Sequence, residues 1–178
     1  MYDGSQFLLM AQYNRWMNSK LYRICATLSD EERRLDRGAF FKSLHGTLNH
    51  IMYGDKMWMG RFVQEPFTGA KMGQELYADF AALRQERERM DDWMVDWAGK
   101  IHADWLAAPF TFTSGLDGTT RTMPAWALVT QLFNHQTHHR GQITTLLMQM
   151  GIDPGATDVP WIPELAAACG TPQETFPY

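Results

Sequence analysis

The segment from residue 134 to residue 142, NHQTHHRGQ, places His135, His138 and His139 within five positions of a chain that has 6 histidines in all. Imidazole rings bind transition metals, form hydrogen bonds through two nitrogens, and titrate near neutral pH. Three arrangements would explain such a segment: a metal site, a buried hydrogen-bond network, or a solvated surface cluster. The helix that carries the histidines decides among them.

That helix is predicted over residues 124–150, with Pro124 at its first position and Gly151 ending it. Its apolar residues recur at steps of four and three, which places His135 and His139 on the buried stripe. Residues four apart differ by about 40° around a helix, so these two rings can point toward one ion. His138 falls on a polar strip, and we expect it to face solvent or a helix junction. The apolar positions of the stripe are Leu128, Leu132, Ile143, Leu146 and Met150.

A buried histidine pair also has a purely structural explanation, in which each ring donates to a carbonyl and packs. Two neutral rings at this spacing would both need partners, because unpaired buried polar groups cost free energy. A metal site needs a third ligand from another helix. His45 and His50 lie on the helix predicted over residues 43–62 and flank its apolar stripe on opposite sides. Small residues near His50 favour it, although periodicity alone does not choose. His102 is predicted to be exposed in a linker.

Two further helices are predicted, over residues 6–28 and 74–99. The charged run at 84–92, RQERERMDD, is expected mostly on the solvent face of the second. Residues 109–124 alternate apolar and Thr residues around Asp117-Gly118, which is typical of a hairpin or an ordered loop. The polar segment 29–34 could begin a short helix. The tail after Gly151 is expected to be mostly irregular, with a turn or two of helix at 163–168. The sequence therefore predicts an all-α, four-helix bundle with a short extended insert before the last long helix.

The composition limits the classes of protein. At 178 residues one domain, 1–178, is the default, and it can bury a core without a structural metal. The net charge of −4 and the lack of a basic run argue against nucleic-acid binding. Cys25 and Cys169 match no zinc or redox spacing. No signal peptide or membrane-spanning run is recognised, so we expect a cytoplasmic protein with no membrane partner.

Two motifs, LNHIMYGDKMW at 48–58 and NHQTHHRGQI at 134–143, resemble the DinB/YfiT-like superfamily of metal-dependent proteins. Segments 13–22, 117–126 and 151–163 fit the same pattern, so the resemblance covers nearly the whole chain. It implies a four-helix bundle with non-sequential helix order, often dimeric. It also implies that His50, His135 and His139 are the metal ligands, and it thereby selects His50 over His45.

Three neutral imidazoles would hold a divalent Zn, Ni, Fe or Mn ion and leave coordination positions open. The resemblance favours activation of a low-molecular-weight thiol, such as bacillithiol, mycothiol or glutathione, for transfer to an electrophile. Hydrolysis by activated water is a second hypothesis, and a non-catalytic metal-binding or sensor protein is a third. A homodimer is expected.

No general base is identified, because Asp55 lies about 140° around the helix from His50. Arg140 could bind a substrate carboxylate or tie helices together. Gln142 could support a ligand or sit at a helix junction. Trp58 and Trp126 could line a pocket, although core packing is the ordinary role of such residues.

Overall fold

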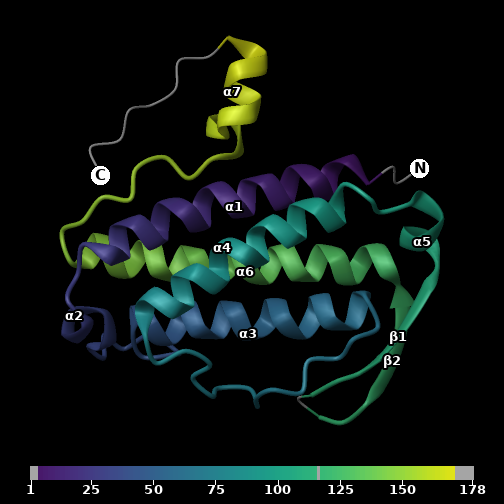
Figure 1. Ribbon diagram of the computed structural model, residues 1–178, viewed down its shortest axis with the longest axis horizontal. Helices are drawn as coiled ribbons and strands as arrows, with labels where there is room; N and C mark the ends of the chain where they lie inside the picture. The colour runs from purple at the N-terminus through teal and green to yellow at the C-terminus, as the bar shows by residue number, and fades with distance from the viewer. Residues whose placement is uncertain (1–3, 116, 171–178) are drawn as a thin grey trace.

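The computed structural model describes residues 4–115 and 117–170, which are mostly helical with one two-stranded hairpin (Figure 1). The mostly helical class and the hairpin ahead of the last long helix are confirmed. The predicted tail residues 171–178 lie outside the described part of the chain. The elements in chain order are α1 (Ser5–Ala26), α2 (Asp30–Arg34), α3 (Leu44–Phe62), α4 (Phe80–Ala98), α5 (Ala103–Ala107), β1 (Pro109–Thr113), β2 (Thr120–Pro124), α6 (Ala125–Gln149), a 3-10 turn (Val159–Trp161) and α7 (Pro163–Cys169).

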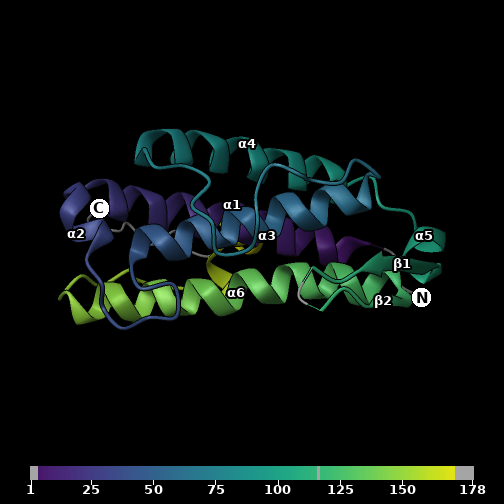
Figure 2. The ribbon, with the colours of Figure 1, turned by 90° about the horizontal axis from the view of Figure 1, so that it is seen from below.

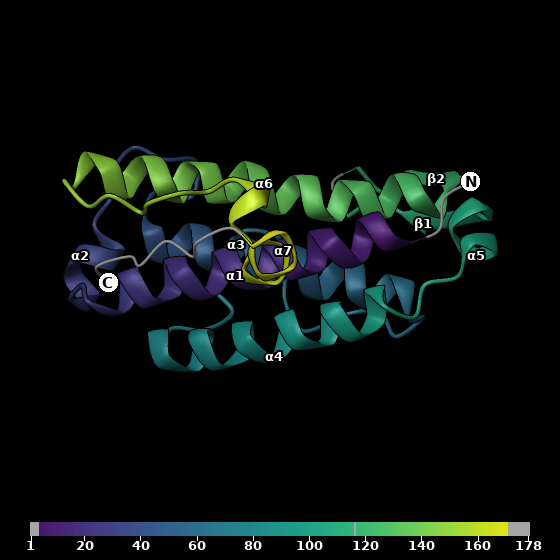
Figure 3. The same cartoon turned by 90° about the horizontal axis from the view of Figure 1, so that it is seen from above.

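Four long helices, α1, α3, α4 and α6, run side by side along the molecule. Figures 2 and 3, seen from opposite sides, show α1 and α3 between α4 and α6, with α3 nearer the viewer in Figure 2 and α1 nearer in Figure 3. Accordingly, α1 packs against α4 and α6, and α3 packs against the same two helices. One neighbour of α3 is therefore α6, which follows it in the chain only after two intervening helices and the hairpin.

The boundaries of α3 and α6 follow their capping residues. The side-chain oxygen of Ser43 accepts a hydrogen bond from the N–H of Gly46 at 3.1 Å, which starts α3 where the sequence predicted. Gly151, with φ of 77°, follows the end of α6. Ser29 and Glu32 form a capping box, so the segment 29–34 does contain a short helix, α2. Pro163–Cys169 forms the helix expected in the tail, and Figure 1 shows it projecting away from α1.

The predicted start of α4 at residue 74 was wrong by six residues. The side-chain oxygen of Asn49 accepts hydrogen bonds from the N–H groups of Leu76 and Tyr77, each at 2.9 Å. These bonds hold the segment as a loop against α3, and Asp79 then caps α4 by accepting from the N–H of Ala82 at 2.7 Å. Helix α5 was not predicted at all.

The insert is an antiparallel hairpin in which Pro109 lies opposite Pro124 and Thr113 opposite Thr120. Gly118, with φ of 69°, provides the left-handed conformation that its turn requires. Phe110 and Phe112 pack against the core, so the hairpin closes one end of the helices. Within residues 4–115 and 117–170, no helix is long and apolar enough to cross a membrane.

A buried polar network crosses the centre of the core. Arg87 and Asp91 of α4 are 2% and 3% exposed, so two members of the charged run lie inside and the expectation of a solvent face fails for them. Arg87 donates to Asp55 of α3 and lies 3.0 Å from Asp91, while Gln136 of α6 donates to Asp55 at 2.6 Å. Opposite charges explain the burial, because each charge finds a partner. The members are Asn14, Asn18, Asp55, Arg87, Asp91, Gln136 and Arg140.

Candidate metal centre

Three histidines from two packed helices come together at the α3–α6 contact. His50 lies in the first half of α3, and His135 and His139 lie one turn apart on α6. Their metal-ligating nitrogens all lie within 4.8 Å of one another, and Nε2 of His50 is 3.0 Å from Nε2 of His135. The ring centroids are 4.4 to 4.9 Å apart. Such a group could hold a metal ion, and its members are the three residues that the sequence selected.

A glycine makes this approach of the helices possible. Gly54 lies on α3 one turn after His50, and a Cβ atom built on it would lie 2.7 Å from Cε1 of His135. Real Cβ atoms do not come so close to a ring carbon, so any other residue would push the imidazole away. The small residues that shared a strip with His50 in the sequence therefore leave room for a ligand on α6.

Gln142 orients one ring of the cluster. Nδ1 of His139 lies 2.8 Å from the side-chain oxygen of Gln142, one turn along the same helix. An amide oxygen only accepts, so Nδ1 carries the proton and donates it, and the lone pair of His139 is on Nε2. Hydrogen bonds of this kind fix the tautomer and orientation of metal-binding histidines. Of the two roles considered for Gln142, support of a ligand fits the geometry.

The environment keeps all three rings in the neutral form that binds metals. Burial, together with the neighbouring His135 and His139 rings, lowers the pKa of His50 to about 3. Burial and the His139 ring lower the pKa of His135 to about 4, and burial also lowers that of His139. Among the described residues, Nδ1 of His50 and Nδ1 of His135 have no hydrogen-bond partner. No proton must therefore be removed at neutral pH before these rings present their lone pairs.

An aromatic ring that the sequence did not indicate covers part of the cluster. Phe41, in the connection between α2 and α3, stacks on His50 with ring centroids 3.7 Å apart and an interplanar angle of 18°. It also meets His139 edge-on at 5.5 Å. In the sequence, this ring is indicated only by the pair of aromatic residues at 40–41, shortly before the helix cap at Ser43. Ordinary core packing explains such a pair equally well.

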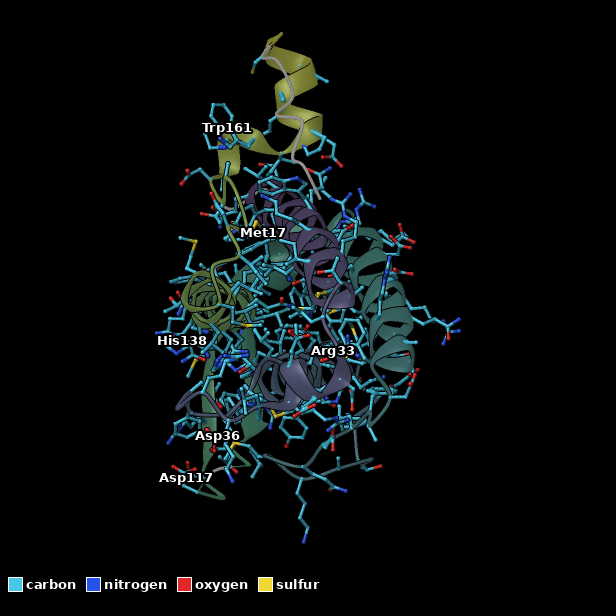
Figure 4. The ribbon with its side chains drawn as sticks, turned by 90° about the vertical axis from the view of Figure 1, so that its left-hand side faces the viewer. Met17, Arg33, Asp36, Asp117, His138 and Trp161 are labelled. Atoms are coloured by element: carbon cyan, nitrogen blue, oxygen red, sulfur yellow. The ribbon has the colours of Figure 1, made fainter. Side chains whose placement is uncertain are left out.

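The other three histidines lie outside the cluster. His45 is buried elsewhere, with Nε2 2.9 Å from the carbonyl oxygen of Tyr77 and 2.7 Å from the carboxylate of Glu75. His138 is exposed, as the polar strip predicted, and Figure 4 shows it on the outer side of α6. His102 is exposed, also as predicted. The helical periodicity therefore separated His138 from its two neighbours correctly.

The remaining candidate residues lie in the buried polar network or pack in the apolar core. Arg140 is 2% exposed and donates to Asn14 of α1 and to Gln136, so it ties α6 to α1. Asp55 is fully buried in the polar network, away from the ligand face as the helix geometry required. Trp58 is buried in the core, and Trp126 is partly buried and packs against the core.

The protein is mostly helical, and its packed helices α3 and α6 bring three histidines together, close enough to hold a metal ion. These features define the class of helical proteins with a candidate metal centre. The sequence places the protein further: the chain belongs to the DinB family, whose profile matches residues 1–175. It is similar to Protein DinB of Bacillus subtilis (strain 168), with 25% identity over 153 residues that cover 83% of this chain and 87% of that protein. The resemblance drawn from the two histidine motifs is thereby confirmed.

Proposed function

We propose that this protein is a metal-dependent enzyme in which His50, His135 and His139 bind one divalent transition ion. The observation that carries the proposal is the convergence of three ligating nitrogens from α3 and α6 within 4.8 Å. Zn, Ni, Fe and Mn all accept imidazole ligands, and the histidines alone do not select among them.

The residues present suit such an ion. The cluster consists of three imidazoles and contains no cysteine or carboxylate, whereas closed structural zinc sites usually have four protein ligands. Among the described residues, Nδ1 of His50 and Nδ1 of His135 are buried without a partner, and the two Nε2 atoms, 3.0 Å apart, can share a single hydrogen bond. A cation would replace that hydrogen bond and bind a lone pair from each Nε2.

We propose that the substrate is a small thiol, which is transferred to an electrophile. When bound, the ion would supply a Lewis acid that stabilises the deprotonated, nucleophilic form of the thiol at neutral pH. The protein would contribute orientation: Gln142 holds the ring of His139, and Gly54 allows His135 to reach the cluster. Phe41 would exclude water from the side of His50 that it covers. The choice of a thiol rests on the resemblance to the thiol-transferring branches of the superfamily.

The finer description of the fold belongs to the same proposal. The pairing of α1 and α3 with both α4 and α6 supports a four-helix bundle with non-sequential helix order. A single domain, a homodimer and a cytoplasmic location accompany it as proposals. We also propose that the protein binds neither nucleic acid nor membranes, since its net charge is −4.

The test is to purify the protein, measure bound metal by mass spectrometry, and follow loss of free thiol with an electrophilic acceptor. About one metal per chain with thiol-dependent turnover supports the proposal. Ester or amide cleavage without a thiol would indicate the hydrolase instead. Bound metal with neither activity would indicate a binding or sensor protein, and absence of stoichiometric metal would overturn the proposal as a whole.

A further inference from the structure

The connection between α2 and α3 runs across α6 and brings Phe41 onto the histidine cluster, and Figure 2 shows its path. The histidines at 50 and 139 belong to different helices, and the Phe41 ring contacts both. A single side chain from outside the two ligand-bearing helices therefore covers the place where they meet.

The backbone beneath Phe41 is fixed in a tight turn. The N–H of Lys42 donates to the carbonyl of Ala39 at 2.7 Å, and the N–H of Arg37 donates to the carbonyl of Lys42 at 2.8 Å. Lys42 has φ of 66°, in the left-handed region that favours glycine. The Phe41 carbonyl also lies so close to Gly46 that a Cβ atom there would overlap it. Movement of the whole turn would break these contacts, so any opening is a rotation of the Phe41 side chain.

Open space lies on both sides of this turn. A hollow of about 380 Å³ is lined by Phe41 and His50 on one side. A second hollow, of about 350 Å³, lies on the other side and is lined by Gln142, the residue that holds His139, and by His138. Phe40 lines both, and the turn separates them. Figure 4 shows Asp36, at the start of this turn, below His138 on the same side of the molecule.

We infer that Phe41 is the residue that controls access to the three-histidine centre. In the position seen here, its ring shields His50 and His139, and rotation of the side chain away from these two rings uncovers them. A ligand would then approach through the hollow that touches His50. Phe41 would thus select small ligands and slow both their entry and the loss of the ion. This inference rests on the proposed function, since it assigns a role toward the metal that the histidines would bind.

The test uses the full-length protein loaded with Co²⁺, whose visible absorption reports changes in coordination, and imidazole as the probe ligand. Phe41→Ala should bind imidazole at least about tenfold more tightly than the parent protein and should release Co²⁺ to a chelator at least about tenfold faster. Phe41→Leu, which keeps apolar volume at the site, should give intermediate values. Circular dichroism verifies that each variant is folded.

Phe67→Ala is the control. It removes the same kind of ring, but Phe67 packs near Tyr53 and lines neither of the two hollows beside the turn. Its imidazole affinity and Co²⁺ release should stay within about twofold of the parent. Equal changes in both variants, or parent-like behaviour of Phe41→Ala at full Co²⁺ occupancy, would overturn the inference and leave the proposed function intact. Failure of Phe41→Ala to bind Co²⁺ stoichiometrically, with no chelator present, would show that the ring holds His50 in place and would also overturn the inference. A parent protein that binds no Co²⁺ would instead refute the proposed function.

Discussion

Gly54 of α3 lies directly against the imidazole of His135 on α6, so that a Cβ atom added there would lie only 2.7 Å from Cε1 of that ring. The position of the His135 ring therefore depends on Gly54, a residue that has no side chain to bind an ion. It also gives a first prediction. Gly54→Ala should weaken metal binding at least about tenfold, or 1.4 kcal/mol, because His135 must move away from His50.

The measurement is a competition titration with a chromophoric chelator. Gly141→Ala is the control, since it lies on α6 near the same histidines but a Cβ atom there meets nothing within 4 Å. Its metal affinity should match that of the parent protein. Unchanged affinity in Gly54→Ala would show that α3 and α6 can separate without cost to the site.

His135 lies in the histidine cluster and His138 lies outside it, although they are three residues apart. His135→Ala should abolish stoichiometric metal while the protein stays folded, because a large apolar core surrounds the site. His138→Ala should keep its metal, since the exposed ring lies outside the cluster. Metal content by mass spectrometry and helicity by circular dichroism check both. The opposite pattern would contradict the assignment of ligands.

The metal-free protein should lose stability as the pH falls below about 6.5. Burial lowers the pKa of His50 to about 3 and of His135 to about 4, so the unfolded chain binds protons that the folded chain does not. The contribution of the two neutral rings to the free energy of unfolding is therefore present above pH 6.5. It is lost as the pH falls toward 4 for His135 and toward 3 for His50. Asp55 acts in the opposite direction, because burial raises its pKa to about 6.

Urea unfolding with a chelator present, at several pH values, separates these effects. In His135→Leu the contribution of one imidazole is removed while that of Asp55 is retained. The difference in unfolding free energy between the parent protein and His135→Leu should therefore shift in favour of the variant as the pH falls from 6.5 to 4. A difference that does not change with pH would show that His135 titrates normally in the fold.

Arg87 and Asp55 form an ion pair at the centre of the core. Asp55→Ala should destabilise the protein by about 3–5 kcal/mol, because it leaves the buried guanidinium with too few partners. Replacing all three charges, Asp55→Leu and Arg87→Met together with Asp91→Asn, should recover much of that loss, because Arg87 is also the partner of Asp91. Glu88→Ala, which breaks the exposed pair with Arg84 on the same helix, should cost no more than about 1 kcal/mol. Urea denaturation measures all three, and equal losses at Asp55 and Glu88 would refute the role of burial.

Helical periodicity was sufficient to predict two of the three clustered histidines and to separate them from His138. It could not choose between His45 and His50, because each flanks the apolar stripe of α3, and the resemblance to a family was needed. Periodicity also failed for Arg87 and Asp91. Their burial depends on partners from α1 and α3, which a single-helix pattern does not contain.

Other features depend on contacts between distant segments. The cover that Phe41 provides arises from a turn crossing another helix, and nothing near residue 41 in the sequence indicates which helix that is. The start of α4 was misplaced because Asn49, 27 residues earlier, binds the backbone of Leu76. Local propensity alone extended the helix too far.

The bonds from Asn49 to Leu76 and Tyr77 fasten the long α3–α4 connection one position before His50. The outer part of that connection, around the exposed Met72, carries none of those bonds, whereas Gly73 and Gln74 line the hollow beside His50. Extra residues inserted just before Met72 would extend into solvent and leave the histidines undisturbed. This position is therefore a suitable place to attach a fluorescent label or an affinity tag, and relatives of the protein could differ in length at this point while keeping the same site.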